Sequence, residues 1–156
     1  MPVPIVLSKG EKMAEQMNRI FFGIFLLAAA WEDGRRKSIS IQLFISAGTA
    51  GIILCLLQRE DLISRLTGCL VGLALLVVSR LTNESVGTGD GCFFIISGLF
   101  FPVLFNLKLL VYGLSLCGIF CSLFFLINRV NGVDVGKEKI PFIPFLVPVW
   151  LIMVLR

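Results

Sequence analysis

The sequence predicts an all-α integral membrane protein with about six transmembrane helices packed in one bundle. Of the 156 residues, 57% are hydrophobic and only 15% are charged, whereas soluble domains carry roughly 25% charged residues. The mean hydropathy of +0.96 points the same way. Six apolar segments follow one another, and the length suits one domain. We therefore expect a single membrane-embedded domain over residues 1–156, with a polar or interfacial N-terminal segment at 1–18.

The six apolar segments differ in length. They are Met13–Trp31, Ile41–Leu57, Leu62–Val78, Cys92–Phe105, Leu107–Ile127 and Ile140–Leu155. A helix that crosses a bilayer needs about 20 residues. The fifth segment meets this length, the second and third are at the lower limit, and the others need flanking residues. Pro102 predicts a kink in the fourth segment, and Pro141, Pro144 and Pro148 predict an extended stretch that leads into the sixth helix.

Six spans would place both termini on one side of the membrane and divide the loops into two sets. One set contains Glu32–Ser40, Ser79–Gly91 and Asn128–Lys139, and the other contains Gln58–Asp61 and a tight turn near Asn106–Lys108. Lys and Arg are balanced over the whole chain. Without the N-terminal tail, seven accompany the first set and four the second. Because Lys and Arg favour cytoplasmic loops, we expect the first set to face the cytoplasm of a multi-pass plasma-membrane protein.

Composition excludes several kinds of chemistry. The chain contains no histidine, which removes Ser-His and Cys-His catalysis and most transition-metal sites. Its five cysteines lie in or beside apolar segments without a C-x-x-C motif, so we interpret them as packing residues; Cys117 and Cys121 share a helix face. The net charge of +4 has no clustered basic face. We expect no metal, no cofactor and no nucleic-acid partner, but membrane lipid as a neighbour.

Two aspartates are the candidate catalytic residues. Gly87–Asp90 forms a G-x-G-D motif just before the fourth apolar segment, where a charged group is costly unless it has a use. The glycines Gly87 and Gly89 would let a peptide backbone approach closely, although they also suit a simple turn. Asp33 follows the first apolar segment, in a loop of the same set. We therefore expect Asp33 and Asp90 at one membrane face.

A pair of carboxylates a few ångströms apart cannot readily lose both protons. One keeps its proton, and the pair can then act as acid and base on a single water. This is the chemistry of aspartic proteases, which needs neither histidine nor metal. Taken singly, Asp33 and Asp90 would each be ordinary solvated loop charges.

Three stretches resemble the type IV prepilin peptidases, also called leader peptidases, and the resemblance runs from about Ile20 to Leu155. Residues 33–39, Asp-x-Arg-x-Lys-x-Ile, resemble the family's D-x-R-x-R-x-I-P loop. Gly87–Asp90 matches the family's G-x-G-D in full. Residues 136–145, Gly-Lys-Glu-Lys-Ile-Pro-Phe-Ile-Pro-Phe, are similar to G-x-x-x-I-P-F-G-P-F before the last helix.

The resemblance implies that Asp33 and Asp90 are the catalytic aspartates at the cytoplasmic face. The expected substrates are prepilins or pseudopilins, cut between a short basic leader and an apolar helix. Gly87 and Gly89 would admit the extended scissile segment, and Glu32 or Glu84 would attract the leader. Larger family members carry an N-terminal domain with a cysteine tetrad that is linked to methylation of the product. Nothing here matches it, so the expectation is a short, peptidase-only form.

The chain departs from the family pattern at three points. Ser40 stands where the family has proline, Cys92 where many members have lysine, and Ile143 where a small residue is usual. These departures concern the loop after Asp33, the surroundings of Asp90 and the start of the last helix.

Two other functional classes stay open. One is a non-enzymatic membrane protein, such as a small transporter or an assembly subunit. A transporter should place charged residues deep in several spans, and the second, fifth and sixth segments are almost purely apolar. The other is a G-x-G-D intramembrane protease with a different substrate. The sequence carries no signal for the oligomeric state.

Overall fold

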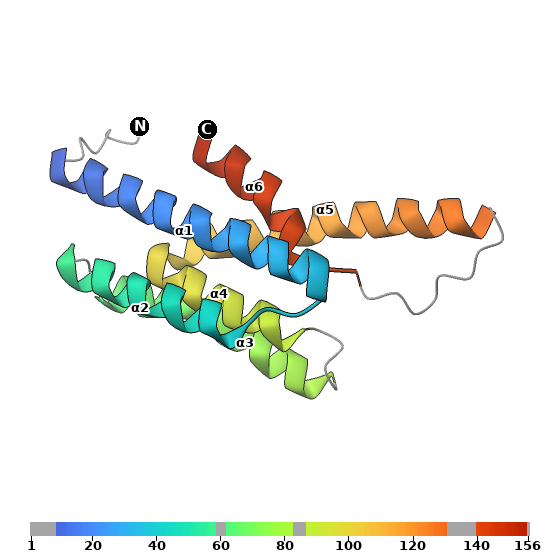
Figure 1. Ribbon diagram of the computed structural model, residues 1–156, viewed down its shortest axis with the longest axis horizontal. Helices are drawn as coiled ribbons and strands as arrows, with labels where there is room; N and C mark the ends of the chain where they lie inside the picture. Colours follow the sequence, from blue (N-terminus) through green and yellow to red (C-terminus); the bar gives the residue numbers. More distant parts are fainter. Residues whose placement is uncertain (1–8, 59–61, 83–86, 131–139, 156) are drawn as a thin grey trace.

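The protein is a bundle of α-helices in the computed structural model, which describes residues 9–58, 62–82, 87–130 and 140–155 (Figure 1). The helices are α1 (Lys9–Arg36), α2 (Ile41–Leu57), α3 (Leu62–Leu81), α4 (Thr88–Phe100), α5 (Val103–Val130) and α6 (Ile143–Leu155). The described residues contain six helices and no strand. The helical class that the sequence predicts is confirmed.

The helices run roughly along one direction, so their ends gather at two ends of the bundle (Figure 1). α1 ends, and α2, α4 and α6 begin, at the end drawn on the right. α3 and α4 form the most extensive pair, α1 packs on α6, and α2 packs on α4. α5 contacts α3 and α6, and its second half projects beyond the other helices. The arrangement therefore brings three segments that are distant in sequence to one end.

Glycines let α3 and α4 touch backbone to backbone. A Cβ atom added at Gly72 of α3 would lie 2.2 Å from the backbone nitrogen of Ile95, and one at Gly98 of α4 would lie 2.3 Å from that of Cys69. Small residues commonly allow such close approach between membrane helices. Because α4 is held so tightly against α3, the position of its first turn, which carries Asp90, is well defined.

The phenylalanines of the fourth apolar segment form the core rather than a lipid-facing surface. Phe93, Phe94, Phe100 and Phe101 are buried. The fully buried ring of Phe22 from α1 lies 5.0–5.9 Å from three of them, centroid to centroid. Aromatic pairs of this kind contribute roughly 0.5–1.5 kcal/mol each beyond their area of contact. They fix α1 against α4.

A buried cluster of polar side chains joins α3, α4 and α5 at the end of the bundle where α4 ends and α5 begins. The amide nitrogen of Asn106 donates to the carbonyls of Gly68 and Phe101, at 3.4 and 3.3 Å, and its oxygen accepts from the Ser97 hydroxyl at 2.5 Å. The Arg65 guanidinium donates to the Phe100 carbonyl. The bonds to Phe100 and Phe101 satisfy backbone carbonyls at the junction between α4 and α5, where helical hydrogen bonding stops.

Several predicted boundaries were wrong. α1 continues through Asp33 to Arg36, so this acid lies on a helix and not in a loop. The turn expected near 106–108 lies instead at Phe101–Pro102, because proline cannot donate the next helical hydrogen bond and disfavours helical geometry in the residue before it. The prediction for the start of the sixth segment is confirmed in part: residues 140–142 are not helical, but Pro144 and Pro148 lie within α6, which begins at Ile143.

Two helices are long and apolar enough to cross a membrane, Ile63–Leu81 and Val103–Val130. Many large apolar side chains are exposed on the outer faces of α2, α3 and α5. Soluble monomers rarely expose continuous apolar patches of more than a few hundred Å². The surface therefore indicates membrane association, and six membrane-crossing helices stay a prediction.

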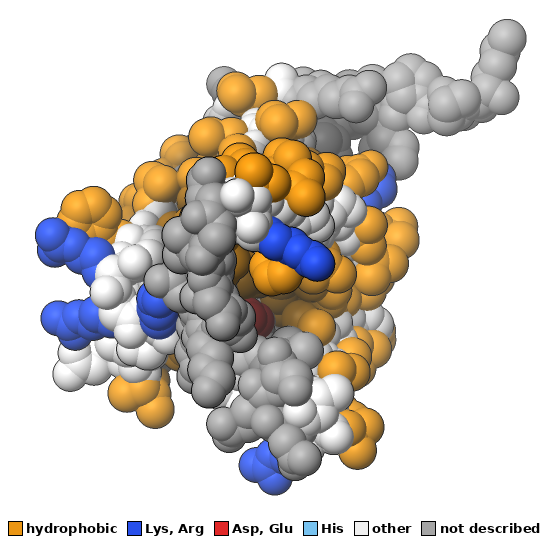
Figure 2. Space-filling model, turned by 90° about the vertical axis from the view of Figure 1, so that its right-hand side faces the viewer, with side chains coloured by type: hydrophobic (Ala, Val, Ile, Leu, Met, Phe, Trp, Pro, Cys, Tyr) orange, Lys and Arg blue, Asp and Glu red, His pale blue; other side chains and the backbone are white. Residues whose placement is uncertain are grey.

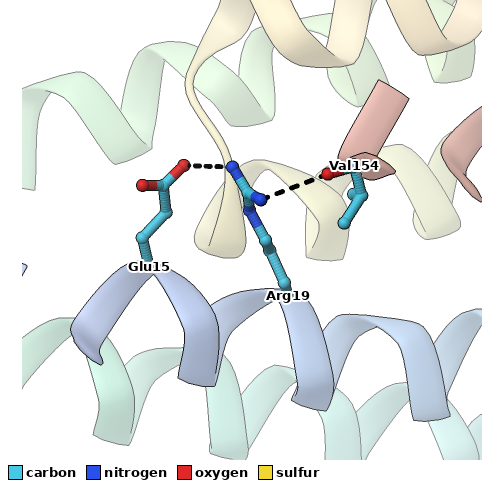
Figure 3. A network of polar contacts seen from close by, with 3 residues as sticks. All are labelled: Glu15, Arg19 and Val154. Carbon is cyan, nitrogen blue, oxygen red and sulfur yellow. Dashed lines mark hydrogen bonds and ion pairs between the residues drawn. The ribbon is translucent and has the colours of Figure 1, made fainter. Parts of the chain in front are cut away.

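Figure 3 shows a polar contact in the first half of α1. The guanidinium of Arg19 lies 2.5 Å from the carboxylate of Glu15 and donates to the carbonyl of Val154 at 3.3 Å. It thereby links the first half of α1 to the last turn of α6.

Candidate active site

A cavity of about 700 Å³ opens where α1 ends and α4 begins. Its lining comprises Asp33, Lys37, Ser38, Ile39, Ile41, Phe44, Gly87, Thr88, Gly89, Asp90, Cys92, Ile95, Ile96 and Phe142. Figure 2 looks onto this end and shows an acidic side chain at the bottom of a hollow, with apolar and basic side chains around it. All four residues that the sequence singled out, Asp33, Gly87, Gly89 and Asp90, line this one cavity.

Asp33 lies near the end of α1 and is half-buried. One of its carboxylate oxygens accepts the backbone N–H of Ile143 at 3.1 Å, and the backbone N–H of Phe142 also donates to it. The two donors come from the start of α6, where N–H groups have no helical partner. Burial raises the pKa of Asp33 above its usual value, and these hydrogen bonds oppose the rise because they stabilise the charged form.

Asp90 lies in the first turn of α4, just ahead of the apolar part of that helix. Burial, and then the negative charge of Asp33, raise the pKa of Asp90 to about 7. Gly87 makes room for the Asp90 carboxylate, because a Cβ atom there would lie 3.1 Å from one of its oxygens. Gly89 faces open space, with nothing within 4 Å of its missing side chain. The two glycines thus serve different purposes.

The two carboxylates are close enough for the charge of Asp33 to act on Asp90. Backbone donors favour the ionised form of Asp33, while deeper burial favours the protonated form of Asp90. Asp90 is therefore the carboxyl of the pair that keeps its proton to the higher pH, up to about 7. An ionised and a protonated carboxyl beside one cavity can accept and donate a proton to a single reacting molecule.

The loop between α1 and α2 is tied down by Glu32. Its carboxylate accepts the backbone N–H of Ser40 at 2.7 Å and the Ser40 hydroxyl at 3.1 Å. These bonds lower the pKa of Glu32. A proline at position 40 could not donate the first bond, so Ser40 provides a different means of fixing this loop. Glu32 is occupied in this way, and Glu84 lies outside the described residues.

Sequence reasoning missed three contributors to the cavity. Phe142 and Ile143 supply the backbone donors to Asp33, and Lys37 lines the cavity wall. Phe142 and Ile143 belong to the stretch 136–145 that resembles the family pattern, but nothing in that stretch pointed to a contact with Asp33. Cys92, where many family members have lysine, lines the cavity without adding a charge. Within the described residues, no group of three or more Cys, Asp or Glu side chains could hold a metal ion.

The chain was compared with known proteins. The sequence profile of the type IV leader peptidase family matches residues 20–126, which include both aspartates. No curated protein and no solved structure matches the chain.

Proposed function

Because the chain belongs to the type IV leader peptidase family, we propose that it is an aspartic endopeptidase that removes the basic leader from prepilin or pseudopilin precursors. Membership of this family makes the protein a membrane-associated peptidase. The substrate, the two-aspartate mechanism and the membrane face are the proposal.

One observation carries the mechanism: Asp33 and Asp90 line the same cavity, and burial and the charge of Asp33 raise the pKa of Asp90 to about 7, while backbone hydrogen bonds oppose the rise at Asp33. A water held between them would lose a proton to Asp33 while its oxygen attacks the carbonyl carbon of the scissile peptide. Asp90 would give its proton to the carbonyl oxygen. Collapse of the resulting intermediate breaks the C–N bond, and the amine leaves with a proton returned by the carboxyl pair.

The position of the cavity fits a substrate with a polar leader and an apolar helix. It opens at the end of an apolar bundle, and aliphatic and aromatic side chains make up much of its wall. We infer that the six helices cross the membrane, that the apolar part of the substrate lies beside them, and that the leader leaves toward the cytoplasm. The open space at Gly89 would admit the extended segment between the two.

A second candidate is an intramembrane protease of the G-x-G-D type with another substrate. The isoleucine and phenylalanine side chains on the cavity wall would suit an apolar segment at the scissile bond.

The test is cleavage of a candidate prepilin by the purified protein in detergent or liposomes, followed as a gel shift. The wild type should release the leader, whereas Asp33→Asn and Asp90→Asn should not. Glu15→Gln is the matched control, because it removes an acidic charge at the opposite end of α1 (Figure 3). Cleavage within the apolar helix instead of before it would favour the second candidate. Full cleavage by either aspartate variant would contradict the mechanism.

A further inference from the structure

Lys37 has a backbone conformation that normally favours glycine. Its φ is 53°, and no other non-glycine residue in the described part of the chain has a positive φ. It ends α1, with its N–H donating to the carbonyl of Asp33 at 2.9 Å. Helices usually end in this way with glycine, because a Cβ atom is strained there. The chain thus keeps a side chain at a position where glycine would fit with less strain.

Three consecutive basic residues, Arg35, Arg36 and Lys37, lie at the end of α1, and their side chains have different surroundings. The Arg35 guanidinium lies over the Trp31 ring, 4.7 Å from its centroid. Arg36 is exposed and does not line the cavity. Lys37 does line it, and because its side chain is also exposed, it lies at the open rim.

The Lys37 ammonium has no counter-ion among the described residues, where the one ion pair joins Arg19 and Glu15. It also contributes nothing to the pKa of Asp33 or Asp90, which burial, hydrogen bonds and their mutual interaction account for. Lys37 is the sole Lys or Arg of the described residues on the cavity wall. The positively charged Lys37 side chain therefore lies at the cavity that would hold the peptide, and the two aspartates do not neutralise its charge.

We propose that Lys37 is a substrate-binding residue whose ammonium donates a hydrogen bond to a backbone carbonyl oxygen of the bound peptide. This inference rests on the proposed function. A basic leader would be repelled by the ammonium, so the carbonyl belongs to the side of the scissile bond that becomes the mature protein. The left-handed conformation at Lys37 ends α1 four residues after Asp33, at the wall of the cavity that both aspartates line.

The experiment compares Lys37→Met, Lys37→Gly and Lys37→Arg, with Arg36→Met as the control for loss of one adjacent positive charge. Steady-state cleavage of a prepilin-type precursor gives kcat and KM, and thermal unfolding gives stability. Loss of a hydrogen bond from a charged donor predicts a fall of roughly 10- to 100-fold in kcat/KM for Lys37→Met and Lys37→Gly. Lys37→Gly should unfold at the same or a higher temperature than wild type. Lys37→Arg should recover most of the activity, and Arg36→Met should cleave normally.

Wild-type kcat/KM in Lys37→Met overturns the inference while leaving the peptidase intact. Loss in Lys37→Gly alone would assign the effect to the backbone and also overturn it. Equal losses in Lys37→Met and Arg36→Met would indicate an effect of general surface charge, which likewise contradicts a specific hydrogen bond from Lys37. A wild type that cleaves no precursor would instead overturn the proposed function, and this inference with it.

Discussion

The end of α1 and the start of α4 each bring an aspartate to the cavity, but the surroundings of the two carboxylates differ. At the end of α1, Asp33 is half-buried and receives N–H groups from Phe142 and Ile143. At the start of α4, Asp90 is more deeply buried, faces the charge of Asp33, and receives no hydrogen bond on its carboxylate from the described residues. The pKa of both aspartates is raised by burial, but hydrogen bonds oppose the rise at Asp33 and a neighbouring negative charge adds to it at Asp90.

This difference shows how two identical side chains can take the two roles of acid and base. The distinction does not come from the residues themselves but from the helix beside each of them. The start of α6 supplies donors to Asp33, whereas the glycine-mediated packing of α3 and α4 holds the helix whose first turn carries Asp90. Changes on either side should therefore have separable effects.

The largest expected effect is on cleavage by Asp33→Asn and Asp90→Asn. Each removes one half of the proton exchange and should lower kcat by roughly 10²- to 10⁴-fold. Because the two acids act as a unit, the double variant should be no worse than the more damaged single variant. Steady-state cleavage assays measure this. Losses that multiply would mean that the two aspartates work independently.

The second effect is on the stability of the fold and concerns Asp90, at the start of α4. A pKa raised from 3.8 to about 7 means that folding favours the protonated form of Asp90. Its stabilising contribution is complete below pH about 4 and is lost as the pH rises through 7. Relative to wild type, Asp90→Asn, which is always neutral, should therefore become more stable as the pH is raised from 5 to 8, by at most roughly 3 kcal/mol. Unfolding at both pH values gives the difference, and a gain that is independent of pH would contradict the assignment.

The third effect tests what holds α4. Gly98→Ala would push a Cβ atom against the backbone of Cys69, and overpacking of this kind costs roughly 1–3 kcal/mol. We expect lower thermal stability and, because Asp90 moves with α4, slower cleavage. Gly48→Ala is the matched control, since nothing lies within 4 Å of that position and alanine favours helix. Equal behaviour of the two variants would show that the α3–α4 contact does not position Asp90.

The smallest effect is expected on the α1 side. Glu32→Gln keeps one acceptor for Ser40 but weakens both bonds of the loop that follows Asp33. Thermal stability should fall slightly and leader cleavage should persist with a normal KM. A markedly raised KM would instead support the expectation that Glu32 attracts the basic leader.

The sequence predicted which residues meet at the cavity better than it predicted their surroundings. Asp33, Gly87, Gly89 and Asp90 could be selected because an acid at a membrane boundary and glycines beside it are conspicuous locally. α2 was also predicted with its observed bounds, Ile41–Leu57, because polar residues flank a mainly apolar run that contains no charged residue.

The rest depended on contacts between distant segments. Nothing local in Phe142 or Ile143 indicates that their N–H groups bind Asp33, more than a hundred residues away. The helical state of Asp33 was missed because Glu32–Arg36 is polar, and polarity alone suggests a loop. The left-handed conformation of Lys37 was missed because it occurs most often at glycine.

The most direct test of the shared proton is the pH dependence of leader cleavage by the wild-type protein, measured as kcat/KM across pH 4–10. The proposed mechanism requires Asp33 ionised and Asp90 protonated, so it predicts a bell-shaped profile. Its upper limb should begin near pH 7, where Asp90 loses its proton, and fall about tenfold per pH unit beyond it. A rate that keeps rising above pH 8 would contradict the shared-proton mechanism.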